Sequence, residues 1–103
     1  MTRPFRITPR AAQDLRDIAR YTLRTWGRKQ RDAYLNAMDR RSWWLAENPQ
    51  LGKPRADIKD GYYSYPQGSH LIFYLVREAG IDVIGIPHQR MDVLGCWIPA
   101  SNR

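Results

Sequence analysis

An uninterrupted apolar run at residues 71–76 constrains the fold of this chain more than any other feature. All six positions are apolar, and the run mixes aliphatic with aromatic side chains. A strand of this kind must be covered on both faces, so it belongs inside a sheet. A short connection at 78–80 and a second β-branched run at 81–87 follow, which together are typical of a β-hairpin. The sequence therefore predicts a sheet with the strand 71–76 at its centre.

The second strand of this hairpin carries Gly85 and Pro87. Proline has no N–H for the ladder, so regular pairing should end at Pro87. We therefore expect His88, Arg90 and Asp92 to enter a loop at the end of the sheet. In strand-like geometry these three would alternate onto one side. That arrangement fits a functional cluster and a structural Arg90–Asp92 ion pair equally well.

Two helices are predicted ahead of the hairpin. Thr8 followed by Pro9 is typical of a helix start, and Gly27 is a plausible end. The inward positions recur with helical spacing and are Ala11, Leu15, Ile18, Ala19 and Trp26, with Thr22 on the same face. A second helix is expected over residues 28–47. Its inward positions are Tyr34, Met38 and Leu45.

Trp43 falls nearly opposite the inward stripe of the second predicted helix. An exposed tryptophan is a candidate protein contact, because this residue is enriched at binding hot spots. It is an equally good interpretation that loops cover the Trp43 side chain or that it is simply exposed to solvent.

A short edge strand at residues 5–7 precedes the helices, and an aromatic strand at 62–65 with a turn at 66–68 precedes the central strand. The predicted order is β-α-α-β-β-β. Such an order places a helical hairpin on a small, largely antiparallel sheet, in the class α+β. At 103 residues, we expect a single domain over 1–103.

The formal net charge of +7 comes from the N-terminal half, where residues 1–50 hold eleven Lys/Arg against five Asp/Glu. Such a surplus is typical of proteins that bind nucleic acid or an acidic protein. Arg16, Arg20 and Arg24 would form a basic ridge opposite the core stripe of the first helix. No aromatic residue interleaves on that ridge, so a solvated face is favoured over a nucleic-acid contact.

The sequence contains no Gly-rich phosphate loop, no Cys/His cluster at metal spacing and no Ser/His/Asp pattern. With two histidines and one cysteine, it predicts no cofactor, no metal site and no catalytic residue. The single Cys96 cannot form an internal disulfide, which favours a reducing cytoplasm. We expect neither a signal peptide after Met1 nor a membrane span, since no apolar run approaches ~18 residues.

Several blocks along the chain together resemble a ParE-type toxin of the RelE/ParE superfamily. They are residues 7–18, Tyr21, Trp26 with Gly27, residues 45–49 with 51–52, residues 70–74 and the motif at 88–92. The blocks occur in the family's order over nearly the whole chain. The resemblance implies a helical hairpin against a small sheet, which agrees with the order read from the residues.

The resemblance also implies the toxin of a toxin–antitoxin module that inhibits DNA gyrase by binding and is neutralised by a ParD-type antitoxin. In such a module, the candidate target-binding residues are Arg77, His88, Arg90 and Asp92, and Trp43, expected to be exposed, is the candidate antitoxin-binding residue. A ribosome-dependent messenger RNA endoribonuclease of RelE type, and an inactive homologue that binds only an antitoxin, remain alternatives.

For the RelE-type alternative, the sheet offers Arg77, His88 and Arg90, and the preceding loop offers Lys53, Arg55 and Lys59. No tyrosine follows Tyr74, so the RelE-like set is incomplete. The chain also departs from many ParE relatives: Gly85 stands where they have arginine, and Pro87 replaces an aliphatic residue.

Overall fold

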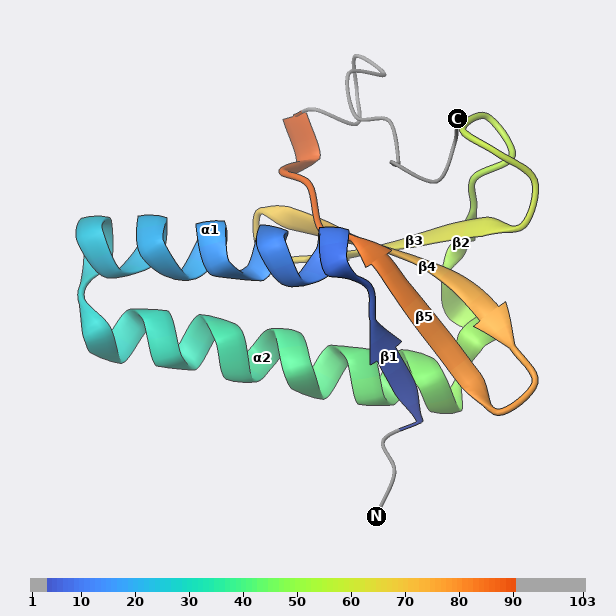
Figure 1. The fold of residues 1–103 in the computed structure, drawn as a ribbon, viewed down its shortest axis with the longest axis horizontal. Helices are drawn as coiled ribbons and strands as arrows, with labels where there is room; N and C mark the ends of the chain where they lie inside the picture. Colours follow the sequence, from blue (N-terminus) through green and yellow to red (C-terminus); the bar gives the residue numbers. More distant parts are fainter. Residues whose placement is uncertain (1–3, 91–103) are drawn as a thin grey trace.

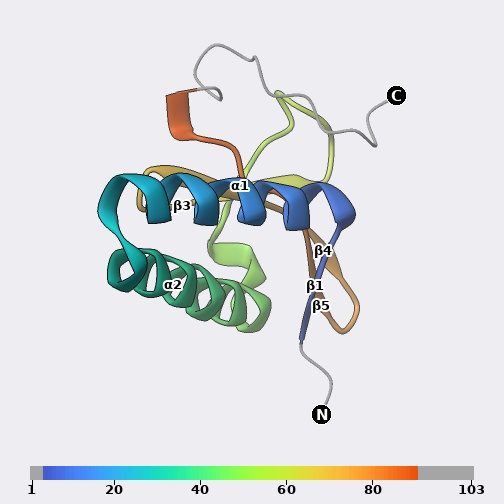
Figure 2. The ribbon, with the colours of Figure 1, turned by 60° about the vertical axis from the view of Figure 1, so that its left-hand side comes forward.

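The computed structural model describes residues 4–90 and shows a helical hairpin lying on one face of a five-stranded sheet (Figures 1 and 2). Its elements are β1 (Phe5–Ile7), α1 (Pro9–Trp26), α2 (Arg28–Glu47), a 3-10 turn (Pro49–Leu51), β2 (Lys53–Pro54), β3 (Tyr62–Gln67), β4 (His70–Arg77) and β5 (Gly80–Gly85). The predicted α+β class and the order β-α-α-β-β-β are confirmed, with the two-residue β2 as an addition.

The strand β4 lies at the centre of the sheet, as the apolar run predicted. The strand order is β1-β5-β4-β3-β2; β1 pairs with β5 in parallel, and all other pairs are antiparallel. Residues 71–74 are buried, but Val76 is 46% exposed. Cover on both faces therefore extends along only part of the run.

The two faces of β4 pack against different layers. Ile72 and Tyr74 face the helices and join the larger core with Ile18 and Met38. On the other face, Leu71 and Phe73 form a second buried cluster with Tyr62 and Ile84.

Arg55 belongs to this second layer. It is one of the three loop cations, yet its side chain is buried, with its guanidinium over the Phe73 ring at 5.2 Å from the centroid. Its Nε and Nη2 donate to the Asp57 carboxylate at 3.0 and 2.8 Å, and its Nη1 donates to Ser64 at 3.3 Å. A buried cation needs such partners, so Arg55 holds the 52–61 loop against the sheet.

The helix boundaries follow the predicted signals. The Thr8 side chain accepts a hydrogen bond from the Ala11 N–H at 3.3 Å, with Pro9 as the first helical residue. Gly27 separates α1 from α2 at a positive φ of 95°. No helix among residues 4–90 is long and apolar enough to cross a membrane.

The prediction that Trp26 packs in the core is wrong, because its side chain is 69% exposed. Trp26 is the last residue of α1, and the tip of the hairpin projects beyond the strands (Figure 1). Helical spacing alone gives the direction of a side chain around the helix but does not show where the sheet ends.

Two predicted turns shift by one or two residues. Pro66 lies within β3 opposite Leu71, and the turn falls at residues 68–69. Because β2 pairs only with Tyr63 and Ser64, no neighbouring strand needs the N–H that Pro66 lacks. Gly80 likewise belongs to β5 rather than to the turn before it.

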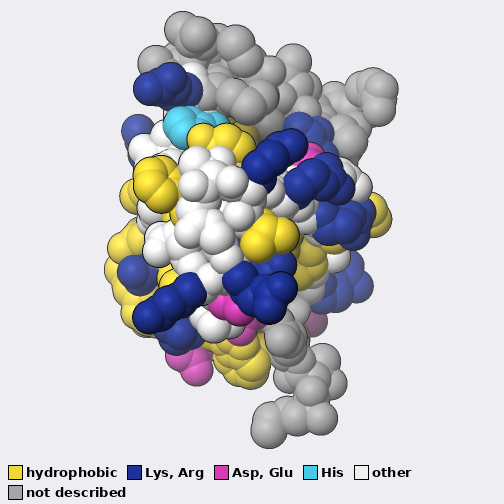
Figure 3. Space-filling view, turned by 90° about the vertical axis from the view of Figure 1, so that its left-hand side faces the viewer, with side chains coloured by type: hydrophobic (Ala, Val, Ile, Leu, Met, Phe, Trp, Pro, Cys, Tyr) yellow, Lys and Arg dark blue, Asp and Glu magenta, His cyan; other side chains and the backbone are white. Residues whose placement is uncertain are grey.

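The basic ridge is exposed as predicted. The Arg16 Nη2 donates a hydrogen bond to the Gln13 Oε1 at 2.8 Å, and the Arg20 Nη1 lies 3.6 Å from the Asp17 Oδ1. Arg24 makes no such side-chain contact with the described residues. Figure 3 views the tip of the helical hairpin, where Lys and Arg side chains clearly outnumber acidic ones. The surplus charge is thus displayed on the helical layer.

Candidate functional site

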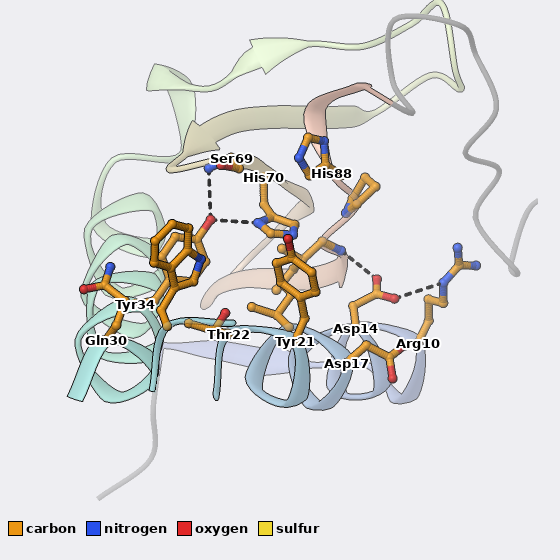
Figure 4. Close-up of a pocket in the computed structure, with 14 residues that line it drawn as sticks. Arg10, Asp14, Asp17, Tyr21, Thr22, Gln30, Tyr34, Ser69, His70 and His88 are labelled. Atoms are coloured by element: carbon orange, nitrogen blue, oxygen red, sulfur yellow. Dashed lines mark hydrogen bonds and ion pairs between the residues drawn. The ribbon is translucent and has the colours of Figure 1, made fainter. Parts of the chain in front are cut away.

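A cleft of about 640 Å³ opens between the helical hairpin and the end of the sheet (Figure 4). Its lining comes from four segments that are distant in sequence. They are α1 with Arg10, Asp14, Asp17, Ile18, Tyr21, Thr22 and Trp26; α2 with Gln30 and Tyr34; the start of β4 with Ser69 and His70; and the segment Ile86, Pro87 and His88.

The segment after β5 is fixed in place by backbone hydrogen bonds. β5 ends at Gly85, two residues before Pro87, so the regular ladder stops earlier than predicted. His88 does not enter a loop but forms an isolated antiparallel bridge with His70. The Leu71 N–H donates to the Pro87 carbonyl at 2.9 Å, and the Gln89 N–H donates to the Ser69 carbonyl at 2.9 Å. This segment therefore forms one wall of the cleft and is attached to β4 along its length.

Asp14 ties this wall to α1. Its Oδ2 accepts a hydrogen bond from the Ile86 N–H at 2.8 Å, and its Oδ1 lies 3.7 Å from Arg10 Nε (Figure 4). The contact satisfies a partly buried backbone donor beyond the end of the sheet. Asp14 thus fixes the distance between the helix and the wall.

Tyr34 and His70 form the polar floor of the cleft. The Tyr34 Oη accepts a hydrogen bond from the Ser69 N–H at 3.0 Å and lies 2.7 Å from His70 Nδ1 (Figure 4). The single hydroxyl proton fits the short contact to His70 Nδ1 better than the Gln67 carbonyl at 3.3 Å. His70 is then a neutral ring with its proton on Nε2.

The electrostatics agree with this assignment. Burial, and then the nearby His88, lower the pKa of His70 from 6.5 to about 4. Burial also raises the pKa of Tyr34, against a smaller opposing effect of the Ser69 N–H. Near neutral pH the pair is therefore uncharged and acts as a hydrogen-bonded support.

His88 lies at the solvent side of the same cluster. Its ring is exposed and meets the His70 ring edge to face, with centroids 5.4 Å apart. Its Nδ1 accepts a hydrogen bond from the Arg90 N–H at 3.2 Å. The backbone at Gln89 and Arg90 is helical, so the expected strand-like alternation of His88 with Arg90 is wrong.

The structure brings together only part of the predicted target-binding set. His88 and Arg90 are adjacent and exposed at the mouth of the cleft. Arg77 lies at the opposite end of β4, where its Nη1 is 3.1 Å from the Asp82 Oδ1. Asp92 lies outside the described residues, so its pairing with Arg90 stays a prediction.

Trp43 lies away from the cleft lining, beside the first strand. Its ring is 37% exposed and meets the Phe5 ring edge to face at 6.0 Å between centroids. The side chain thus combines a fixed orientation with an accessible surface, and its role in binding an antitoxin stays a prediction.

The sequence did not identify several cleft residues as functional candidates. Tyr21 and Trp26 expose large aromatic surfaces at the hairpin, and Asp14 and His70 were not singled out for the site. The signal for Tyr21 was available, because its position on α1 lies beside the basic ridge and away from the core stripe. The contact between Asp14 and Ile86 spans 72 residues and has no local signature.

Within residues 4–90, no group of three or more His, Cys, Asp or Glu side chains could hold a metal ion. Among the described residues, no carboxylate or thiol lies near enough to His70 and His88 to complete such a set. Because the Nδ1 of neutral His70 accepts the hydrogen bond from Tyr34, its Nε2 carries the proton and is poorly suited to metal binding. The described part of the cleft is suited to contact with a partner through hydrogen bonds and apolar surface.

Comparison with known proteins places these features in a family. Residues 5–93 match the family model described as ParE toxin of type II toxin-antitoxin system, parDE. The chain is 33% identical to Toxin ParE1 of Caulobacter vibrioides over 90 residues, covering 87% of this chain and 93% of that protein. It is 36% identical to Toxin ParE1 of Mycobacterium tuberculosis over 94 residues, covering 90% and 96%.

A solved structure shares the fold. It is titled Chromosomal ParDE TA system from P. aeruginosa, and it superposes with a TM-score of 0.70 at 16% identity over 82% of this chain and 92% of that chain. From the family model and the two relatives, we conclude that the chain belongs to the ParE toxin family of type II toxin–antitoxin systems.

Proposed function

We propose that this ParE-type toxin inhibits DNA gyrase by direct binding and is neutralised by a ParD-type antitoxin. Membership of the ParE family supports the general role, and the resemblance that the sequence carries supports gyrase as the target. In this proposal the toxin acts in the cytoplasm and needs no cofactor.

The observation that carries the proposal is the exposed His88–Arg90 pair at the mouth of the cleft. The backbone beside it is held to β4 by hydrogen bonds, and the Arg90 guanidinium has no ion pair within residues 4–90. A guanidinium makes directional, bidentate contacts to carboxylates, so it is well suited to recognise a protein surface. Asp92 remains a predicted member of this surface, and Arg77 would touch the target at a separate point on β4.

The state of the two histidines favours binding over acid–base catalysis. His70 is uncharged near neutral pH because its pKa is about 4, so it has no readily available proton to donate. His88 is exposed, and its Nδ1 accepts a hydrogen bond from the Arg90 N–H. A single exposed imidazole beside an arginine can make contacts without performing chemistry.

We further propose that Trp43, which lies on α2 beside β1 and away from the cleft, anchors the antitoxin. The ring is held by Phe5 and leaves an accessible face, as in the aromatic anchors of protein interfaces. The net charge of +7 favours an acidic partner.

Purified toxin added to gyrase supercoiling and DNA-cleavage reactions tests the proposal. We expect loss of supercoiling that depends on toxin concentration and is reversed by the cognate antitoxin. A parallel ribosome-dependent translation reaction serves as the control and should show intact messenger RNA. Full gyrase activity together with messenger RNA cleavage that His88→Ala abolishes would move the protein to the ribonuclease class.

A further inference from the structure

The outer edge of β1 is open at Ile7. Hydrogen bonds from the Ile81 N–H to the Pro4 carbonyl and from the Thr8 N–H to the Val83 carbonyl, both 3.1 Å, bracket the parallel pairing of β1 with β5. The bonding groups of a strand in such a ladder come from alternate residues. The N–H and C=O of Ile7 therefore point away from β5, where no further strand of the described sheet lies.

A small apolar hollow lies beside this edge on the helical side of the sheet. It has a volume of about 200 Å³ and is lined by Phe5, Ile7, Leu15, Leu35, Met38, Asp39, Ser42 and Ile86. A residue paired directly with Ile7 would place its side chain on the same face as the Ile7 side chain. That face carries the hollow, so the paired residue should be apolar.

The other face of the same edge is basic. The Arg6 side chain is 71% exposed, and its Nε lies 3.2 Å from the Asp82 Oδ1. Arg77 also contacts this oxygen, at 3.1 Å, so two guanidinium groups share one carboxylate. These two arginines and one aspartate leave a net charge of +1 on this face. The charge lies beside the positions that would flank a residue paired with Ile7.

We propose that the β1 edge and its hollow bind an extended segment of a partner protein, in which an apolar residue opposite Ile7 is flanked on both sides by Asp or Glu. The segment runs antiparallel to β1, so the residue paired with Ile7 exchanges two backbone hydrogen bonds with it, the hollow takes the central side chain, and Arg6 contacts the acidic neighbours. The inference rests on the proposed function in naming the antitoxin as the source of the segment.

A second copy of this chain is a poorer occupant of the edge. Antiparallel pairing of β1 with another β1 around Ile7 would place each Arg6 opposite Thr8 of the other strand. Both Arg6 side chains would then lie on one face, where two positive charges repel without an acidic partner. An acidic segment removes that repulsion and neutralises the surplus charge. Trp43, which packs on Phe5, would flank the same segment and adds a hydrophobic contact.

A blocked peptide with a single Glu-Val-Glu core between Gly and Ser residues is a direct probe of the edge. We expect it to bind the full-length toxin in calorimetry. Methylation of the valine backbone nitrogen removes the hydrogen bond to Ile7 and should weaken binding roughly tenfold. Methylation of the first glutamate nitrogen serves as the control, because that nitrogen points away from β1. Equal affinities of the two methylated peptides would overturn the inference.

Charge reversal on the toxin tests the basic face. Arg6→Glu should lose affinity for the Glu-Val-Glu peptide by roughly tenfold and gain affinity for the matching Lys-Val-Lys peptide. Arg16→Glu makes the same charge change at an exposed position on α1 and should leave both affinities near wild type. Arg6→Gln provides a neutral variant if the reversal proves unstable beside Asp82. Wild-type affinity of the folded Arg6 variants for both peptides would contradict the proposed contact.

The cognate antitoxin separates this inference from the proposed function. If the antitoxin binds Arg6→Glu as tightly as wild type and still restores gyrase activity, the edge proposal fails and the function stands. If wild-type toxin leaves gyrase unaffected, the proposed function fails. In that case the two peptide series still decide whether the edge binds an acidic extended segment.

Discussion

The Asp14 Oδ2 accepts a hydrogen bond from the backbone N–H of Ile86 at 2.8 Å and so joins α1 to the wall of the cleft. The donor belongs to a buried residue at the point where β5 has ended. A single side chain thus replaces the strand partner that Ile86 lacks.

Removing this acceptor should destabilise the fold and loosen the cleft. We expect Asp14→Ala to lower the free energy of unfolding by about 1–3 kcal/mol, because the Ile86 N–H loses its partner. Asp14→Asn keeps an acceptor oxygen and should lose less. Urea denaturation measures both, and the exposed Asp17→Ala is the matched control, expected within about 0.5 kcal/mol of wild type. An Asp14→Ala protein as stable as the control would show that the contact is dispensable.

The depressed pKa of His70 predicts a specific dependence of stability on pH. The folded-state pKa of about 4 lies below the ordinary value of 6.5, so the unfolded chain binds the proton more readily. The contribution of neutral His70 is present above pH 6.5 and is lost as pH falls toward 4. Thermal unfolding between pH 7 and 4 should therefore show a decline that is shallower in His70→Asn. Parallel decline of the two proteins would assign the pH dependence to other groups.

Gly80 is a position where a side chain cannot be accommodated. Its φ is 150°, and an added Cβ would collide with the Pro4 carbonyl, which accepts the hydrogen bond from Ile81. We expect Gly80→Ala to cost more than about 2 kcal/mol, from backbone strain and displacement of β1 together. Gly61→Ala is the control, since its φ of 91° is also positive but its Cβ would meet nothing within 4 Å. Similar losses in the two variants would show that strain alone explains the effect.

Arg90 should matter for toxicity and little for stability. Its side chain is exposed, so Arg90→Lys and Arg90→Ala should melt within about two degrees of wild type, as surface changes usually do. Both should relieve growth inhibition if the guanidinium contacts the target. Asp92→Ala tests the predicted ion pair: a shared loss of stability in the aspartate and arginine variants would make the pair structural. Full toxicity of Arg90→Ala would end its role in target binding.

Trp43 should be an anchor for the antitoxin. Trp43→Ala is expected to weaken the toxin–antitoxin complex by roughly 2 kcal/mol, measured as a dissociation constant. Trp26→Ala removes a more exposed tryptophan at the hairpin tip and is the control for a general loss of aromatic surface. An unchanged dissociation constant for Trp43→Ala would remove it from the interface.

The sequence predicted those parts of the fold that depend on neighbouring residues. Thr8 with Pro9, and Gly27, marked the limits of α1, since capping and backbone freedom are local properties. The apolar run at residues 71–76 placed β4 at the centre of the sheet, because the need for cover on both faces is visible in the strand's own residues. Pro66 was misjudged because its tolerance in β3 depends on how far β2 extends.

The candidate site was predicted only where proline fixed the backbone. Pro87 marked the loss of the regular ladder, which ends at Gly85, but His88 still pairs with His70 of β4 in an isolated bridge, and the backbone becomes helical only from Gln89. The Tyr34–His70 contact depends on the packing of α2 against the start of β4, and no spacing in the sequence reports that packing. Arg77 was grouped with His88 by residue type, although the length of β4 separates them.

The pairing of β1 with β5 has a consequence for synthesis of the toxin. β1 cannot pair until β5 has been synthesised. Their contacting residues Arg6 and Asp82 are 76 positions apart in the sequence. At roughly 5–20 residues per second, a ribosome needs several seconds to supply that partner. The Ile86 wall of the cleft is translated later still. A growing chain therefore lacks both the closed sheet and the cleft, and a toxin with this topology becomes competent only after Ile86 has been translated.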